Sequence, residues 1–186
     1  MSKIVFFCIP AYGHTNPTIE VVRELVKRGN QVHYYSFYEF RSRIEETGAV
    51  CIPCDDFMPP APKDIDKKVG KDLSSLVDMT VDVTLAMEYK VLGELRAWKP
   101  DCIVSDSICI WGKLYAKKLN VPFVCSTTTF AFNQQTARLM KQSLSELLRM
   151  LSGMPRINAR LRQLRRHGYE IRQFYELLQN DNDTET

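Results

Sequence analysis

Phe6-Phe7-Cys8-Ile9-Pro10-Ala11-Tyr12-Gly13-His14-Thr15-Asn16-Pro17 leads from an apolar strand through a turn into an amphipathic helix. A strand that passes directly into a helix in this way is typical of an α/β fold. Residues 4–9 are almost all apolar, which is typical of a strand buried on both faces of a parallel sheet. In the turn, Gly13 is expected to let the backbone bend where a Cβ would obstruct it. Asn16 is expected to cap the helix, and Pro17 to occupy its first position.

His14 is expected at the carboxyl end of this first strand, beside the N-terminus of the helix. Open α/β sheets bind their ligands at that edge. Two interpretations of His14 are open at this point. One is a histidine that only completes a turn. The other is a general base, because imidazole is the side chain whose unperturbed pKa lies near neutrality.

The rest of the chain alternates between strand and helix patterns. Apolar runs bounded by Gly, Asn or Pro predict strands, and apolar residues at helical spacing predict helices. The alternation predicts an α/β fold, a Rossmann-like doubly wound parallel sheet in the order 3-2-1-4-5, followed by extra C-terminal helices. In that order the first and fourth strands are neighbours, so the loops that follow them face each other. The predicted strands cover residues 4–9, 31–36, 49–53, 102–106 and 123–126, and the predicted helices cover residues 17–28, 37–47, 72–98 and 110–119 and segments between 132 and 178.

Three polar clusters are expected to meet between those loops: His14, Asp106, and the segment Thr127–Thr129 with Phe130. A carboxylate that accepts from one imidazole nitrogen fixes the tautomer and stabilises the imidazolium formed when the other nitrogen takes a proton. Such a pair can deprotonate a hydroxyl group so that its oxygen attacks an electrophile. The sequence contains no G-x-S-x-G, G-x-G-x-x-G or G-x-x-x-x-G-K-[ST] motif, which disfavours an α/β-hydrolase, a dinucleotide-binding protein and a P-loop nucleotidase.

The composition is that of a globular protein, with 186 residues, 45% hydrophobic and 25% charged. The net charge of +3 is too small to favour nucleic acid as a partner. Basic residues concentrate between Arg138 and Arg172, where nine Lys/Arg outnumber two Asp/Glu. A solvated helical face explains this concentration. The alternative is weak membrane contact through the basic C-terminal helices, by way of the segment Ile157–Arg166, in which Leu161 and Leu164 lie among arginines.

The cysteines favour a cytoplasmic protein, because all six lie in or beside predicted strands and helices, as small buried hydrophobes do in a reducing compartment. Cys51 and Cys54 form a C-x-x-C motif, which is compatible with a redox pair or half of a zinc site. Asp55, Asp56 and a proline-rich loop follow it, whereas a reactive thiolate needs a helix N-terminus. We therefore expect both thiols to be structural. The sequence shows no secretory signal and no apolar run long enough to span a bilayer.

Three longer motifs stand in a specific order along the chain. They are Ile9-Pro-Ala-Tyr-Gly-His-Thr-Asn-Pro17, Pro100-Asp-Cys-Ile-Val-Ser-Asp-Ser107 and Ser126-Thr-Thr-Thr-Phe-Ala-Phe-Asn133. Together they resemble the N-terminal half of UDP-glycosyltransferases of the macrolide glycosyltransferase type, over residues 3 to 178. The resemblance implies one half of a GT-B fold, in which two Rossmann-like domains face each other across a cleft. The N-terminal domain of that fold binds the acceptor, and the C-terminal domain binds the nucleotide sugar.

The resemblance also implies roles for single residues. It places the general base at His14 and its orienting partner at Asp106, in a displacement that inverts the anomeric carbon of a hexose as UDP departs. No metal or other cofactor is expected, because the UDP-sugar is a co-substrate. The donor phosphates are expected near the start of the first helix, at Gly13, Thr15 and Asn16. The residues expected to bind a small hydrophobic acceptor are Met79, Met87, Thr129, Phe130, Phe132 and Met140. Ordinary core packing is the alternative for the apolar side chains among them.

Residues 1–178 are expected to form the acceptor-binding domain, and residues 179–186 a polar tail. The C-terminal donor domain is expected to be absent, because the donor-binding motif of the family does not occur in this sequence. Two functions stay open. One is the acceptor half of a sugar-transfer enzyme, which binds a UDP-sugar only together with a donor domain. The other is a catalytically silent fragment that binds a ligand or a partner chain.

Overall fold

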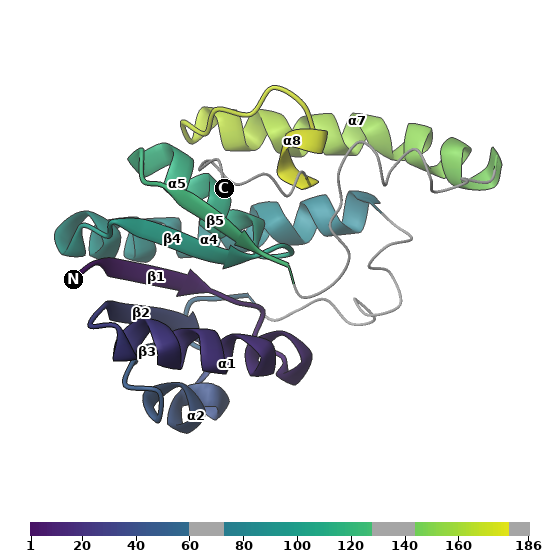
Figure 1. Cartoon of the computed structure of the whole chain (residues 1–186). Coiled ribbons are helices and arrows are strands. Elements are labelled where there is room, and N and C mark those ends of the chain that lie inside the picture. The colour runs from purple at the N-terminus through teal and green to yellow at the C-terminus, as the bar shows by residue number, and fades with distance from the viewer. Residues whose placement is uncertain (60–72, 128–143, 179–186) are drawn as a thin grey trace.

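A computed structural model of the chain describes residues 1–59, 73–127 and 144–178 (Figure 1). The helix expected to begin near residue 132 and the expected polar tail, 179–186, fall outside the described residues. The described strands are β1 (Lys3–Phe7), β2 (Gln31–Ser36), β3 (Val50–Pro53), β4 (Cys102–Asp106) and β5 (Phe123–Ser126). The described helices are α1 (Tyr12–Lys27), the 3-10 turn η1 (Tyr38–Phe40), α2 (Arg41–Glu45), α4 (Leu73–Trp98), α5 (Ile110–Leu119), α7 (Leu144–Arg166) and α8 (Tyr175–Leu178).

The strands form one parallel sheet in the order β3-β2-β1-β4-β5, as the sequence predicts. β1 is central, paired with β2 on one side and with β4 on the other. The register aligns Phe7 of β1 with Tyr35 of β2 and with Ser105 of β4. The segment that follows Phe7 therefore comes next to Asp106, the last residue of β4.

Successive side chains of β1 and β2 point to opposite faces of the sheet and build two separate cores. Phe6 stacks on Tyr34 with ring centres 5.6 Å apart, in the core that α1 and α2 cover. Phe7 stacks on Tyr35 with ring centres 4.8 Å apart, in the core beneath α4 and α5. Helices lie on both faces (Figure 1), which explains why β1 is apolar from Ile4 to Phe7.

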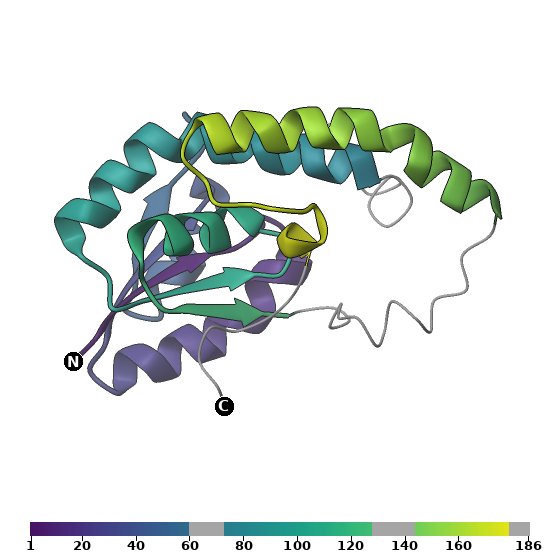
Figure 2. The same cartoon turned by 90° about the horizontal axis from the view of Figure 1, so that it is seen from above.

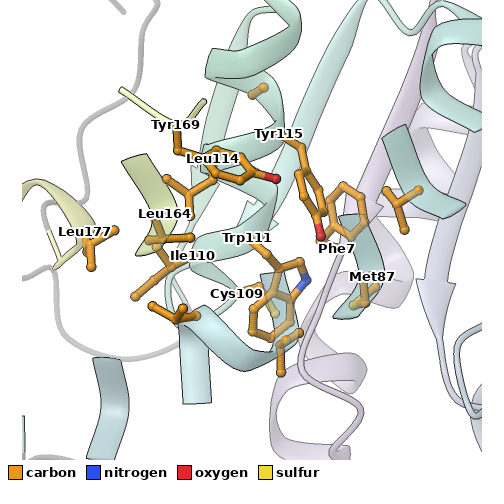
Figure 3. Packing of buried hydrophobic residues seen from close by; sticks show 14 of the residues in the cluster. Phe7, Met87, Cys109, Ile110, Trp111, Leu114, Tyr115, Leu164, Tyr169 and Leu177 are labelled. Carbon is orange, nitrogen blue, oxygen red and sulfur yellow. The ribbon is translucent and has the colours of Figure 1, made fainter. Parts of the chain in front are cut away.

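The larger core centres on α5, whose Trp111 is only 2% exposed. Figure 3 shows the rings of Phe7, Trp111 and Tyr115 gathered in this core. Tyr115 meets Phe7 edge to face with ring centres 5.8 Å apart, and its hydroxyl donates to the Thr84 carbonyl at 2.7 Å. Burying each such side chain stabilises the fold by roughly 1.5–3 kcal/mol. Because α5 begins just after Asp106, this packing also fixes the end of β4.

Helices α4 and α7 lie side by side over this core (Figure 2). Ile157, Leu161 and Leu164 of α7 are each at most 1% exposed, because they pack against the rest of the protein. This corrects the alternative of membrane contact through Ile157–Arg166, since the protein itself covers the apolar stripe of that segment. Among the helices in the described residues, none combines the length and the apolar composition that crossing a bilayer requires.

Helix α1 begins five residues before the predicted start at residue 17, with Tyr12 as its first residue. The residue before it, Ala11, has the extended conformation of an N-cap. The Ala11 carbonyl accepts hydrogen bonds from the backbone N–H groups of His14 at 3.0 Å and Thr15 at 2.8 Å. His14 therefore lies in the first helical turn and not in a loop.

This earlier start corrects three local expectations. Asn16 is not the helix cap, because it lies inside α1, where its side-chain oxygen accepts from Arg43. Pro17 also lies inside the helix and not at its first position. Gly13 is not needed for a sharp turn, because its φ is not positive and an added Cβ would meet no described atom within 4 Å.

Gly112 allows the close approach of α5 to β4, and its replacement tests the packing beneath the site. A Cβ at Gly112 would lie 2.3 Å from Ser105 Oγ and 3.0 Å from Phe7 Cδ2. Ser105 is itself held, because its hydroxyl donates to the Cys109 carbonyl at 2.7 Å. We predict that Gly112→Ala lowers the free energy of unfolding by about 1–3 kcal/mol, measured by urea denaturation.

Gly93→Ala in α4 is the matched control, because a Cβ at Gly93 meets no atom within 4 Å among the described residues. Alanine in an open helix interior is expected to add about 0.5–1 kcal/mol of stability. Equal effects of the two substitutions would contradict the tight contact at Gly112.

Candidate active site

His14 and Asp106 meet at the carboxyl edge of the sheet, where the sequence predicts that they converge. His14 Nδ1 lies 2.8 Å from Asp106 Oδ2. The first turn of α1 carries His14, the end of β4 carries Asp106, and the pairing of β1 with β4 sets these elements beside each other. The side chain of Asp106 is 1% exposed and that of His14 is 20% exposed, so solvent reaches the pair from the histidine side.

Asp106 is held from a second direction by the backbone that follows it. The Ile108 N–H donates to Asp106 Oδ1 at 2.8 Å, and the Cys109 N–H donates to the Asp106 carbonyl at 2.9 Å. Sequence reasoning did not include Ile108, although an aspartate at the end of a strand commonly accepts from the N–H two residues later. One carboxylate oxygen of Asp106 therefore accepts a hydrogen bond from the backbone, and the other oxygen faces His14 Nδ1.

The pKa of His14 is raised above its ordinary value of 6.5, chiefly by the hydrogen bond to Asp106. Burial acts in the opposite direction, and the negative charge of Asp106 adds to the rise. Because the folded-state pKa exceeds that of the unfolded chain, the pair adds stability that is fully present below pH 6.5. That contribution is lost as the pH rises through the folded-state pKa of His14.

The geometry defines which ring nitrogen can take up a proton. A carboxylate oxygen only accepts, so Nδ1 is the nitrogen that donates to Asp106. The neutral ring of His14 then carries its lone pair on Nε2. Proton uptake at Nε2 forms an imidazolium that the Asp106 carboxylate stabilises. The pair therefore has the chemical makeup of a general base with a fixed tautomer.

Comparison with known proteins gives relatives of one kind, although no family model matches the chain. It is 30% identical over 126 residues to NDP-glycosyltransferase YjiC of Bacillus subtilis (strain 168), covering 68% of this chain and 32% of that protein. It is 35% identical over 149 residues to demethyllactenocin mycarosyltransferase of Streptomyces fradiae, covering 74% and 32%. Its fold matches the crystal structure of the calicheamicin glycosyltransferase CalG4 with a TM-score of 0.68 and 22% identity, over 98% of this chain and 45% of that one.

The chain is homologous to one domain of the macrolide-type NDP-glycosyltransferases. It spans about a third of the length of the curated relatives that it matches. Its parallel sheet and interleaved helices correspond to half of a GT-B fold.

The residues of this glycosyltransferase domain that were expected near the donor phosphates lie in different environments. Gly13 is in the first turn of α1, and a Cβ there would meet none of the described atoms within 4 Å. Thr15 is 0% exposed and its hydroxyl lies 3.5 Å from the Ile9 carbonyl, so its side chain faces the core. That Thr15 lies near the donor phosphates stays a prediction. Asn16 is exposed, and its side chain is occupied by the hydrogen bond from Arg43.

Two of the expected acceptor residues belong to the larger core. Met87 is 1% exposed and Met79 is 8% exposed, and Figure 3 shows Met87 among the packed side chains around Trp111. Ordinary packing accounts for both methionines, so we no longer assign them to an acceptor pocket. The other expected acceptor residues, Thr129, Phe130, Phe132 and Met140, lie outside the described part of the chain.

Cys8, which directly follows β1, is not a nucleophile. Burial raises the pKa of Cys8 to about 12, and the charge of Asp106 adds to that rise. Cys51 and Cys54 are both free and buried, and burial raises their pKa values, that of Cys51 to about 11. Both thiols are therefore protonated at neutral pH, which confirms the structural interpretation of the C-x-x-C motif.

The potential metal-ligating side chains of residues 1–59, 73–127 and 144–178 do not gather into a cluster. No group of three or more His, Cys, Asp and Glu side chains in those ranges could hold a metal ion. That the chemistry needs no metal stays a prediction.

Replacement of Asp106 tests the electrostatics of the pair. We predict that Asp106→Asn lowers the pKa of His14, because the charge-assisted hydrogen bond and the negative charge that raise it both come from the Asp106 carboxylate. Titration by ¹H–¹⁵N NMR measures this, and a His14→Gln variant assigns the signals among the three histidines of the chain.

Glu88→Gln is the matched control for Asp106→Asn. His167 Nδ1 lies 2.9 Å from Glu88 Oε2, so this variant removes the charge from a second histidine–carboxylate pair, which joins the interior of α4 to the residue after α7. Glu88→Gln should leave the pKa of His14 unchanged. An unchanged His14 pKa in Asp106→Asn would contradict the pairing.

Proposed function

We propose that this chain is the acceptor-binding domain of an inverting, UDP-sugar-dependent glycosyltransferase that moves a hexose to a hydroxyl group of a small hydrophobic acceptor. The observation that carries the proposal is the 2.8 Å contact between His14 Nδ1 and Asp106 Oδ2, at the edge where β1 and β4 end together. The homology to glycosyltransferases supports the same reaction class.

In the proposed reaction His14 is the general base. Its Nε2 takes the proton of the acceptor hydroxyl while the hydroxyl oxygen forms a bond to the anomeric carbon of the sugar. The bond from that carbon to the UDP oxygen breaks, and its electron pair leaves with UDP. Attack from the face opposite UDP inverts the configuration. Asp106 holds the ring and stabilises the imidazolium, and no metal ion takes part in the step.

The donor in this proposal is bound mainly by a second domain. The chain spans about a third of its relatives, so residues outside 1–178 would supply the uracil and ribose contacts. The first turn of α1 would approach the phosphates through its backbone, since helix N-termini favour anions. Open space beside Gly13 supports this assignment, because a side chain there would occupy the same region.

The acceptor class is inferred from a relative. The Streptomyces fradiae protein is named as a mycarosyltransferase that acts on demethyllactenocin, and we extend transfer to a small-molecule hydroxyl from that protein to this chain. Thr129, Phe130 and Phe132 stay our candidates for acceptor contacts.

A fusion protein tests the proposal. Residues 1–178 are joined to the donor-binding half of the Bacillus subtilis relative, and transfer from UDP-glucose is measured on a panel of hydroxylated small molecules. We predict that His14→Ala in the fusion lowers kcat by about 10²- to 10⁴-fold, the usual contribution of a general base. Asp106→Asn should cost less, because the base is misoriented but still present. Activity should rise with pH through the raised pKa of His14, because only the neutral ring accepts a proton.

The control is His167→Ala, which removes a histidine that also contacts a carboxylate but lies at the end of α7. It should leave kcat unchanged, and the chain alone should show no transfer and no saturable UDP binding at millimolar nucleotide. Ordinary turnover in His14→Ala would contradict the assignment of the base. Binding of acceptors by an inactive fusion would favour the alternative, a silent ligand-binding module.

A further inference from the structure

The first turn of α1, which carries His14, lacks some of the hydrogen bonds that usually stabilise the start of a helix. The Ala11 N-cap provides no side-chain hydrogen bond, so the usual support from a capping Ser, Thr, Asp or Asn is missing there. Pro17 has no N–H, so the Gly13 carbonyl receives no bond from the position that would normally supply it. A turn of this kind needs support from elsewhere if the histidine is to stay in register with Asp106.

A buried column of hydroxyl groups lies under this turn. The Thr18 hydroxyl is 2.8 Å from the Thr15 carbonyl, which can only accept, so Thr18 donates that bond. The Tyr34 hydroxyl lies 2.7 Å from Thr18 Oγ1 and donates to it, because the Thr18 hydrogen is already used. Thr15, Thr18 and Tyr34 are each at most 3% exposed. The column therefore ties the carbonyl of Thr15, the residue that follows His14, to strand β2.

Tyr34 anchors this column to the sheet. Its ring stacks on Phe6 with an interplanar angle of 7°, and the two residues are register partners in the pairing of β1 with β2. Burial raises the pKa of Tyr34 far above its usual value, so the hydroxyl keeps its hydrogen and stays a donor.

We propose that Tyr34 and Thr18 are positioning residues. They hold the first turn of α1 in the position in which His14 Nδ1 contacts Asp106 Oδ2. The role assigned to them rests on the proposed function of His14 as the base. Neither residue is proposed to touch a substrate, and both act through the backbone of Thr15. Their loss should loosen the contact between His14 and Asp106 without removing either partner.

The test measures the pKa of His14 by ¹H–¹⁵N NMR in the full 186-residue chain. Tyr34→Phe removes one hydroxyl and keeps the ring, so the stack on Phe6 is preserved. We expect the pKa of His14 to fall by about half a unit toward its ordinary value, as its bond to Asp106 weakens. Thr18→Val should produce a similar fall, and Thr18→Ser, which keeps the hydroxyl, should restore the wild-type pKa.

Tyr35→Phe is the matched control, because it makes the same change one residue along β2. Tyr35 is 3% exposed, stacks on Phe7, and its hydroxyl donates to Glu94 Oε2 at 2.7 Å, on the opposite face of the sheet. Its loss should lower stability without changing the pKa of His14.

Two outcomes would overturn the inference. One is a wild-type His14 pKa in both Tyr34→Phe and Thr18→Val. The other is an equal fall in Tyr35→Phe, which would mean that general loosening of the fold is responsible. The titration needs neither donor nor acceptor, so its result is independent of the transfer assay that tests the proposed function.

Discussion

The pairing of β1 with β4 holds the candidate active site together. It places two segments from distant parts of the sequence side by side at the carboxyl edge of the sheet. The sheet that contains this pair separates the two cores, because alternate residues of β1 face α1 on one side and α4 and α5 on the other. The nearly buried carboxylate of Asp106 is tolerated there because a backbone N–H and the ring of His14 both satisfy it.

Much of this arrangement could be predicted from the sequence. Apolar runs bounded by Gly, Asn and Pro leave few choices for the strands, and the common doubly wound order makes the first and fourth strands neighbours. The proximity of His14 to Asp106 follows from that order alone. The start of α1 did not follow, because the local preferences of Asn16 and Pro17 for a helix start are outweighed by packing. Thr15 and Thr18 are buried against the sheet as helical residues, which extends α1 back to Tyr12.

Helical periodicity predicted which faces are buried but not what buries them. Met79 and Met87 share one apolar face of α4, which is compatible with a ligand pocket or with a core. In the structure that face packs against α5 and α7. The stripe around Leu161 on α7 has the same ambiguity, and α4 covers it. A one-dimensional pattern does not contain the partner of an apolar face, so these two assignments needed the tertiary structure.

Asp106 is expected to fix the tautomer of His14 and to leave Nε2 as the atom that accepts a proton. Long-range ¹H–¹⁵N NMR on the labelled chain, recorded above the pKa of His14, distinguishes the two neutral tautomers of its ring. We predict that the hydrogen is on Nδ1, which lies 2.8 Å from Asp106 Oδ2, and that the lone pair is on Nε2. A hydrogen on Nε2 would exclude this role for Asp106, because the ring nitrogen required as the base would then be unable to accept a proton.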